Sequence, residues 1–291
     1  MQAPFRVRPR SGRLHRIWRS RTGLIGLLIV GFVIVLAAAA PVIAPHDPND
    51  GEVIRRLRPP FWMAGGSTEF LLGTDQLGRD TLSRLIFASR PSLLVGVTAV
   101  LVAGVIGVAL GLLAGYFGGF VDFVVTMLIN TIIAFPFIIL TLAIIAFAGR
   151  GLFNMIVVLG IAGWTFYARV LRTEVLSLRD GEFIHAAKVI GAGDGRIVWR
   201  HLLPNVTDSL LVLASLQVAS MILAEAFLSY LGFGIQPPTP SWGNMLADAR
   251  TYMLDRWWLA AFPGALIFLT ALGINLLGDS IRDALDPRSG A

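Results

Sequence analysis

The sequence predicts an all-α integral membrane protein with six transmembrane helices, and three observations lead to this prediction. Of the 291 residues, 55% are hydrophobic and only 14% are charged, whereas about 25% of the residues in a soluble domain are charged. The mean hydropathy is +0.73. Six apolar runs are each long enough to cross about 30 Å of hydrocarbon at about 1.5 Å per residue. Helices are expected because strands leave backbone groups unpaired in lipid unless they close into a barrel.

The six runs cover residues 24–44, 92–116, 121–147, 152–171, 208–230 and 260–281. The first run also has features of a cleaved signal peptide, because Arg residues precede it and the small residues 37–40 lie near its end. It is longer than the usual apolar core of about 7–15 residues in such a peptide. An uncleaved first helix is therefore the preferred interpretation, with cleavage as the alternative.

The distribution of Lys and Arg predicts that both termini are cytoplasmic. Arg residues concentrate before the first run and again after the fourth, while the six Arg residues between the first two runs are balanced by six acids. Within that external part, residues 81–89 are expected to form a short amphipathic helix at the membrane surface. The predicted organisation is a cytoplasmic tail 1–23, a first helix 24–44, an external (periplasmic) segment 45–91, a transmembrane domain 92–281 with a cytoplasmic loop 174–204, and a cytoplasmic tail 282–291.

Several classes of site are not expected in this chain. There is no Cys, which excludes disulfides and thiolate ligands. The four His residues are scattered without the spacing of a metal site, and no catalytic residues converge. The basic residues flank apolar runs, a pattern typical of membrane orientation rather than of nucleic-acid binding.

The cytoplasmic stretch 182–204 has the pattern of a helix, a glycine turn and a second helix. Ala186 and Ala187 are small enough to let another surface approach closely. Gly191 is suited to end the first helix in a left-handed conformation. Asp194 can cap the second helix, and Pro204 is expected to limit its far end. Such a compact unit between two spanning helices predicts docking into a groove on a partner.

This stretch resembles the EAA loop in the membrane subunits of ABC importers. Ala186, Ala187, Gly191, Leu203 and Pro204 match the family spacing, whereas His185 stands where Glu is usual and His201 where Ile is usual. The resemblance implies that the loop couples the spanning helices to a separate ATPase subunit. The residues expected at that contact are Glu182, His185, Ala186, Ala187, Gly191, Asp194, Leu203 and Pro204.

The resemblance covers residues 24–287 and points to the dipeptide/oligopeptide branch of these permeases. Its motifs lie at 72–85, 115–122, 134–136, 225–243 and 278–287. Met127 and Asn130 occupy positions where the branch commonly has an Arg and an Asp. The implied fold is the five-helix core of type I ABC importers with one additional N-terminal helix.

The implied function is that of a permease subunit in an ATP-driven importer of peptides or related small solutes in a bacterial inner membrane. The single lysine, Lys188, lies outside any phosphate-binding glycine loop. No cofactor is therefore expected in this chain, and ATP and Mg are expected on partner ATPase subunits. The other implied partners are a second, paralogous permease and an external solute-binding protein. Alternatives are an importer of nickel, glutathione or another non-peptide solute, a secondary transporter, and a membrane-embedded enzyme.

Other polar residues have two interpretations each. Glu225 lies in an apolar run, which favours a role in translocation or gating, but a hydrated position at the outer boundary is an equal alternative. Asp75, Arg79 and Asp80 are candidates for contact with a binding protein. Pairing among themselves and with Arg84 is preferred, because Asp80 and Arg84 are four residues apart.

Two further features have structural explanations. Gly104, Gly107, Gly111 and Gly115 form the small-residue spacing that allows two helices to pack closely. Asp122 opens a predicted helix, where an acid complements the helix dipole.

Overall fold

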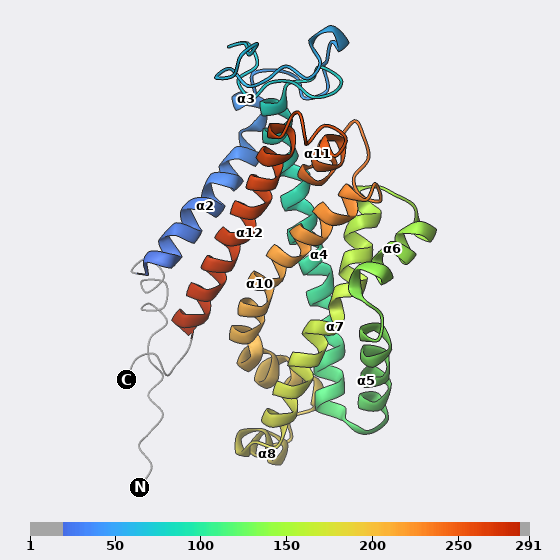
Figure 1. Ribbon diagram of the computed structural model, residues 1–291. Coiled ribbons are helices and arrows are strands. Elements are labelled where there is room, and N and C mark those ends of the chain that lie inside the picture. The colour runs from blue at the N-terminus through green and yellow to red at the C-terminus, as the bar shows by residue number, and fades with distance from the viewer. Residues whose placement is uncertain (1–19, 286–291) are drawn as a thin grey trace.

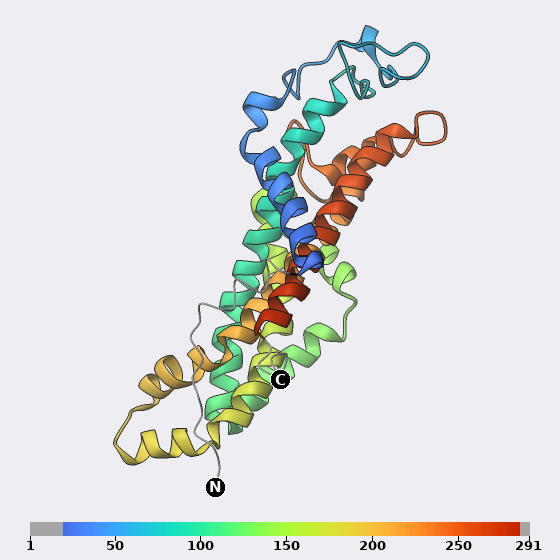
Figure 2. The same cartoon turned by 90° about the vertical axis from the view of Figure 1, so that its left-hand side faces the viewer.

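The computed structural model describes residues 20–285, which form an elongated helical bundle (Figures 1 and 2). Positions 1–19 and 286–291 of the two predicted tails lie outside the described residues. The elements are α2 (Arg21–Ala38), α3 (Ala40–Ile43), the 3-10 turn η2 (Val53–Arg55), α4 (Thr81–Phe117), α5 (Gly119–Ile133), α6 (Phe137–Ala148), α7 (Leu152–Arg179), α8 (Glu182–Val189), α9 (Asp194–Ile197), the π-helical η3 (Val198–Leu202), α10 (Leu203–Tyr230), α11 (Trp242–Ala249) and α12 (Trp258–Leu285).

The described residues contain no strand, and five helices are long and apolar enough to cross a membrane, or six spans if α5 and α6 count as one. This confirms the all-α prediction. The expected continuous helix over 121–147 is wrong, since α5 and α6 meet at an angle of 92°. The break falls before Pro136, which has no N–H to donate and whose ring clashes with the preceding turn.

The second long helix begins earlier than predicted. Asp80 caps α4 by accepting a hydrogen bond from Ser83 N at 2.9 Å, so residues 81–89 are the first turns of α4 and not a separate surface helix. Leu85 is buried there, and its carbonyl accepts a hydrogen bond from Trp242 Nε1 at 3.1 Å. Packing against α11 thus holds α4 helical through Pro91.

Close packing of α4 against α7 depends on three glycines. A Cβ at Gly107 would lie 2.5 Å from Trp164 O, and one at Gly111 would lie 2.9 Å from Ala168 O. A Cβ at Gly115 would lie 2.7 Å from Val175 Cβ. The predicted role of these small residues is confirmed, but not for Gly104, which has open space around it.

The N-terminal helix α2 packs along α12, on the side of the bundle away from α5 and α6 (Figure 1). A Cβ at Gly26 would lie 2.7 Å from Leu277 N, and a Cβ at Gly273 would lie 2.7 Å from Ile29 Cγ2. The additional helix is therefore fixed to the bundle by a crossing that only small residues allow.

Two clusters of buried side chains organise the bundle. One joins α4, α7 and α10 through Val95, Leu159 and Met221. The other lies toward the end that carries α8, where Leu171 of α7 packs with Ile184 of α8 and other apolar side chains. The second cluster holds the loop after α7 against the ends of the spanning helices.

We expect Gly111→Val to lower the free energy of unfolding by about 1–3 kcal/mol, because overpacking forces two closely packed helices apart. The matched control is Gly104→Val, the same substitution on the same helix where the added side chain meets open space. Thermal unfolding in detergent, followed by tryptophan fluorescence, measures both. Equal melting temperatures for the two variants would contradict the packing argument.

Candidate functional site

Helix α8 lies across the lower end of the bundle and presents two different faces (Figure 1). Ile184 and Ala187 are buried, and they pack with Leu112 of α4 and Ile197 of α9. Figure 2 shows the yellow segment around α8 and α9 leaning out to one side, away from the green α5 and α6. One face of α8 is therefore fixed to the bundle while the other is open.

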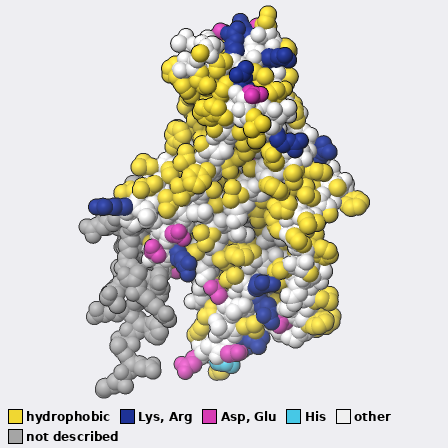
Figure 3. Space-filling view, viewed as in Figure 1, with side chains coloured by type: hydrophobic (Ala, Val, Ile, Leu, Met, Phe, Trp, Pro, Cys, Tyr) yellow, Lys and Arg dark blue, Asp and Glu magenta, His cyan; other side chains and the backbone are white. Residues whose placement is uncertain are grey.

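The open side carries large apolar residues that nothing in the described chain covers. Val189 is 86% exposed and Ile190 is 84% exposed, and Phe183 and Ala186 lie beside them in the sequence and are also exposed. We call these four residues the α8 surface. Figure 3 shows charged side chains gathered at this end, below a largely hydrophobic middle. An apolar surface with a polar rim is typical of a protein contact.

The two predicted alanines have different places. Ala186 belongs to the α8 surface, whereas Ala187 is only 4% exposed and faces the bundle. His185 and Glu182 are exposed, with Glu182 in the first turn of α8. Small size therefore serves internal packing at Ala187, whereas Ala186 lies on the open side of α8.

Gly191 ends α8 in the left-handed conformation that the sequence predicts, with φ at +82°. Gly191 N donates to Lys188 O at 3.0 Å, and Ala192 N donates to Ala187 O at 2.9 Å. These two bonds form a Schellman motif, which closes the end of a helix with a residue at positive φ. A Cβ at Gly191 would meet nothing within 4 Å, so the backbone conformation alone requires glycine there.

Asp194 does not cap the second helix, which corrects the prediction. The capping position is Gly193, and Asp194 is the first residue of α9. Its Oδ1 instead accepts a hydrogen bond from Tyr116 Oη at 2.6 Å, and Lys188 Nζ lies 5.6 Å from the centre of the Tyr116 ring. The sequence reasoning missed Tyr116, although an aromatic hydroxyl at the end of an apolar run was an available signal. Tyr116 fastens the loop to α4.

Pro204 does not end the second helix either. Residues 194–230 run on as one helical stretch, through the π-helical η3 into α10, and Pro204 lies in the first turn of α10. A π-turn widens the helix, and Pro204 has no N–H to donate. Asn205 Nδ2 donates to His201 O at 2.6 Å in that turn. Leu203 packs against the buried cluster beneath α8. The loop and α10 are therefore joined by one continuous helical stretch.

Polar contacts hold α5 and α4 to α7 near the same end. Arg172 of α7 forms a two-pronged ion pair with Asp122 of α5, in which Nη2 lies 2.7 Å from Oδ2. Arg179 Nη1 donates to Gly115 O at 3.3 Å. Asp122 lies in the first turn of α5, as predicted, and also carries this second interaction.

The acids and arginines at residues 75–84 form a network with Asp248 of α11. Asp75 Oδ2 lies 2.7 Å from Arg79 Nε and 3.3 Å from Arg84 Nε. Asp248 Oδ2 of α11 lies 3.5 Å from Arg79 Nη2. The predicted pairing within this group is confirmed, but the specific Asp80–Arg84 pair is wrong because Asp80 caps α4 instead. Asp75, Arg79 and Asp80 are each less than 9% exposed. The network joins the segment before α4, and the start of α4, to α11.

Glu225 is fully buried within the chain. Its Oε1 accepts a hydrogen bond from Ser229 Oγ at 2.7 Å, and its Oε2 accepts one from Ser92 Oγ at 3.3 Å. The second bond reaches across to α4, so Glu225 links α10 to α4 near the end that carries α11.

Comparison with known proteins identifies related chains. The family model described as "Binding-protein-dependent transport system inner membrane component" matches residues 107–290, and the model "N-terminal TM domain of oligopeptide transport permease C" matches residues 12–60. The chain is similar to the di/tripeptide transport system permease protein DppC of Pseudomonas aeruginosa, with 41% identity over 94% of this chain and 92% of the relative.

Two further relatives and one solved structure extend the comparison. The probable D,D-dipeptide transport system permease protein DdpC of Escherichia coli is 40% identical over 90% of this chain and 86% of its own length. The glutathione transport system permease protein GsiD of Pectobacterium atrosepticum is 39% identical over 94% and 89%. The inward-facing MetNI methionine ABC transporter has a chain of similar fold, with a TM-score of 0.57 and 23% identity over 70% of this chain and 96% of that one.

We expect Tyr116→Phe to loosen the loop without unfolding the bundle, because it removes one hydrogen bond worth about 1 kcal/mol. Backbone amides of residues 182–197 should exchange with deuterium roughly fivefold faster. The control is Tyr230→Phe at the other end of α10, where the hydroxyl has no hydrogen-bond partner among residues 20–285. Unchanged exchange in Tyr116→Phe would contradict the proposed fastening.

Proposed function

The chain belongs to the family of binding-protein-dependent transport system inner membrane components, and from this membership we propose that it is the permease subunit of an ATP-driven importer of short peptides. It is a multi-pass protein of a bacterial inner-membrane permease family. The observation that carries the proposal is the exposed α8 surface, which the turn at Gly191 joins to a helix that continues into a membrane span.

Peptides are the preferred substrate class because several relatives at about 40% identity over most of the chain are described as dipeptide or peptide permeases. Glutathione, itself a modified tripeptide, is the alternative supported by the relative described as its permease. Both classes contain peptide groups, so the distinction between them is one of size and charge.

The α8 surface is proposed to dock on a separate ATPase subunit, which would bind ATP and Mg. Phe183, Ala186, Val189 and Ile190 supply the apolar contact, while Glu182 and His185 supply polar contacts at its edge. This chain would take no part in hydrolysis itself. Its own contribution is mechanical, because movement of α8 is passed through Gly191, Asp194 and the continuous helix to α10.

Glu225 is proposed to act in gating. Its carboxylate links α10 to Ser92 of α4, and any movement of these helices relative to each other must break that bond. The hydroxyl of Ser229 on α10 would remain as a partner during the movement. Glu225 would therefore stabilise one arrangement of the two helices over another.

The external segment and α11 are proposed to receive a solute-binding protein. Asp75, Arg79 and Asp80 would serve this contact by holding the backbone in shape, since their side chains are buried. A second, paralogous permease would complete the pathway. With α8 on the cytoplasmic side, both termini would be cytoplasmic, an orientation that the distribution of Arg residues supports.

A reconstituted transporter tests the proposal. The complete complex in proteoliposomes should accumulate radiolabelled dialanine when ATP is supplied to the ATPase subunits, and an ionophore should leave this uptake unchanged. Radiolabelled glutathione is the parallel probe for the alternative. Uptake driven by an ion gradient without ATP would indicate a secondary transporter and overturn the proposal.

We expect Gly191→Val to reduce ATP-dependent uptake about tenfold, because a side chain in the left-handed conformation costs about 1–2 kcal/mol and the turn would change shape. The matched control is Gly193→Val, two residues away, where φ is −71° and suits valine. Uptake and ATP hydrolysis are measured for both, together with co-purification of the ATPase subunits. Equal uptake by the two variants would count against the coupling role.

A further inference from the structure

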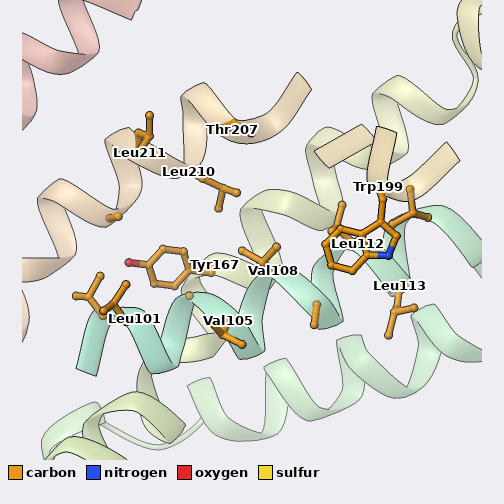
Figure 4. Close-up of a pocket in the computed structure, with 15 residues that line it drawn as sticks. Leu101, Val105, Val108, Leu112, Leu113, Tyr167, Trp199, Thr207, Leu210 and Leu211 are labelled. Atoms are coloured by element: carbon orange, nitrogen blue, oxygen red, sulfur yellow. The ribbon is translucent and has the colours of Figure 1, made fainter. Parts of the chain in front are cut away.

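One side of α10 is hollowed along much of its length. A hollow of about 630 Å³ lies between α4, α7 and α10, lined among others by Leu101, Tyr167, Leu211 and Ala214. Figure 4 shows the Tyr167 ring in this hollow, between Leu101 and Val105 on α4 and Leu210 and Leu211 on α10. A second hollow of about 690 Å³ lies between α6 and α10.

The two hollows follow overlapping faces of the same helix. Six of their lining residues on α10 recur at steps of three and four, the spacing that places side chains along one side of a helix. These six are 207, 210, 214, 217, 221 and 224, while 211 also lines the first hollow and 220, 223 and 227 also line the second. The hollowed side therefore leads from the α8 end of α10 toward its α11 end.

Polar groups without a partner line both hollows. The Tyr167 hydroxyl is buried in the first and has no hydrogen-bond partner. In the second, neither the Gln217 amide nor the Ser220 hydroxyl has a partner among residues 20–285. Several other hydroxyls on the spanning helices donate to a carbonyl of their own helix, as Thr131, Thr141, Ser215 and Thr270 do.

Lipid is a poor occupant for this side of α10. Acyl chains offer no hydrogen bond, and an unpaired polar group in hydrocarbon is costly, most of all an amide with two donors and an acceptor. Polar side chains inside membrane spans face another polar surface or water instead. Water or a polar solute fits the unpaired groups.

We propose that this side of α10 is the surface along which the solute passes, with the Gln217 amide and the Tyr167 hydroxyl as its hydrogen-bonding contacts for peptide groups. The inference rests on the proposed function and deepens it. Amide and hydroxyl groups both donate and accept, as the N–H and C=O of a peptide group require. None of the described residues that line the two hollows is charged, so contact with the peptide backbone does not depend on the charge of its side chains.

The apolar parts of the walls suit the same solute. Phe137 and Phe227 line the hollow beside Gln217, and Leu101 and Leu211 line the one beside Tyr167. Such walls can contact side chains of different size without a specific bond. The backbone contacts are then the shared element, which is the arrangement expected for a pathway that accepts peptides of varied sequence.

Thiol labelling tests whether water reaches the surface. The chain has no Cys, so each of the variants Gln217→Cys and Ser220→Cys carries a single thiol. In the assembled complex, a charged methanethiosulfonate reagent should modify both variants, detected by the mass of this chain. The control is Phe268→Cys on α12, a large exposed apolar position, which should stay unmodified. Absence of modification at 217 and 220, with and without ATP, would overturn the proposal.

Uptake kinetics test the contacts. We expect Gln217→Leu and Tyr167→Phe each to raise the KM for radiolabelled dialanine or lower its maximal rate by about three- to tenfold, as loss of one hydrogen bond does. Ser215→Ala is the control, because that hydroxyl is already bonded to Val212 O of its own helix. ATP hydrolysis without peptide and co-purification of the second permease should be unchanged in all three.

The outcomes distinguish failure of the proposed contacts from failure of the proposed peptide substrate. Wild-type kinetics in Gln217→Leu and Tyr167→Phe would overturn the proposed contacts, and loss of the second permease would mean that a helix of that subunit covers this side of α10. If the thiols react but the wild-type complex transports no dialanine or glutathione, the peptide substrate is wrong and with it the assignment of these contacts. The water-lined surface itself would then stand.

Discussion

Every polar group inside this protein must be satisfied without bulk water, and this constraint governs the rest of the structure. It makes the spans helical, since a helix pairs its own backbone. It also explains why threonine hydroxyls such as those of Thr141 and Thr270 donate to their own helices. Glu225 is tolerated in a span because two serine hydroxyls surround its carboxylate. Tyr167 and Gln217 each have a polar group without a partner among residues 20–285, and both line a hollow that a polar solute could enter under the proposed function.

The proposed coupling role of the loop after α7 depends on how the loop is held to the bundle. Ile184 and Ala187 fix one side of α8 to the bundle, and the Tyr116 hydroxyl holds Asp194 from α4. The Schellman motif at Gly191 sets the angle between α8 and the following helix without any side-chain contact. Because the stretch from Asp194 to Tyr230 is continuous, a displacement of α8 under the proposed mechanism would move α10 as well.

Much of this arrangement follows from local sequence patterns, and the remainder depends on tertiary contacts. The apolar runs, the left-handed turn at Gly191 and the packing of Gly107 and Gly111 come from residue size and spacing alone. The start of α4 could not be predicted, because packing of Leu85 against α11 holds the helix through Pro91. The contact of Arg84 with Asp248 could not be predicted either, since Asp248 lies on α11, far along the chain.

The same distinction applies to the candidate sites. The position of the loop was predictable from its motif, but the opposite directions of Ala186 and Ala187 depend on how α8 lies against the bundle. The Tyr116–Asp194 bond joins residues 78 positions apart, a separation that no local pattern encodes. The sequence places Gln217 in an apolar run but does not indicate its neighbours. The proposed role of Gln217 therefore depends on the hollows along α10, which only the structure shows.

Helix α10 unites these features. Its first turns continue from the loop, its hollowed side carries Gln217, and Glu225 ties it to α4. A rotation or tilt that starts at α8 would therefore move the unpaired amide and strain the Glu225–Ser92 bond at the same time. Opening of the pathway and release of the solute would then need no separate mechanisms. Both would follow from the displacement of α10.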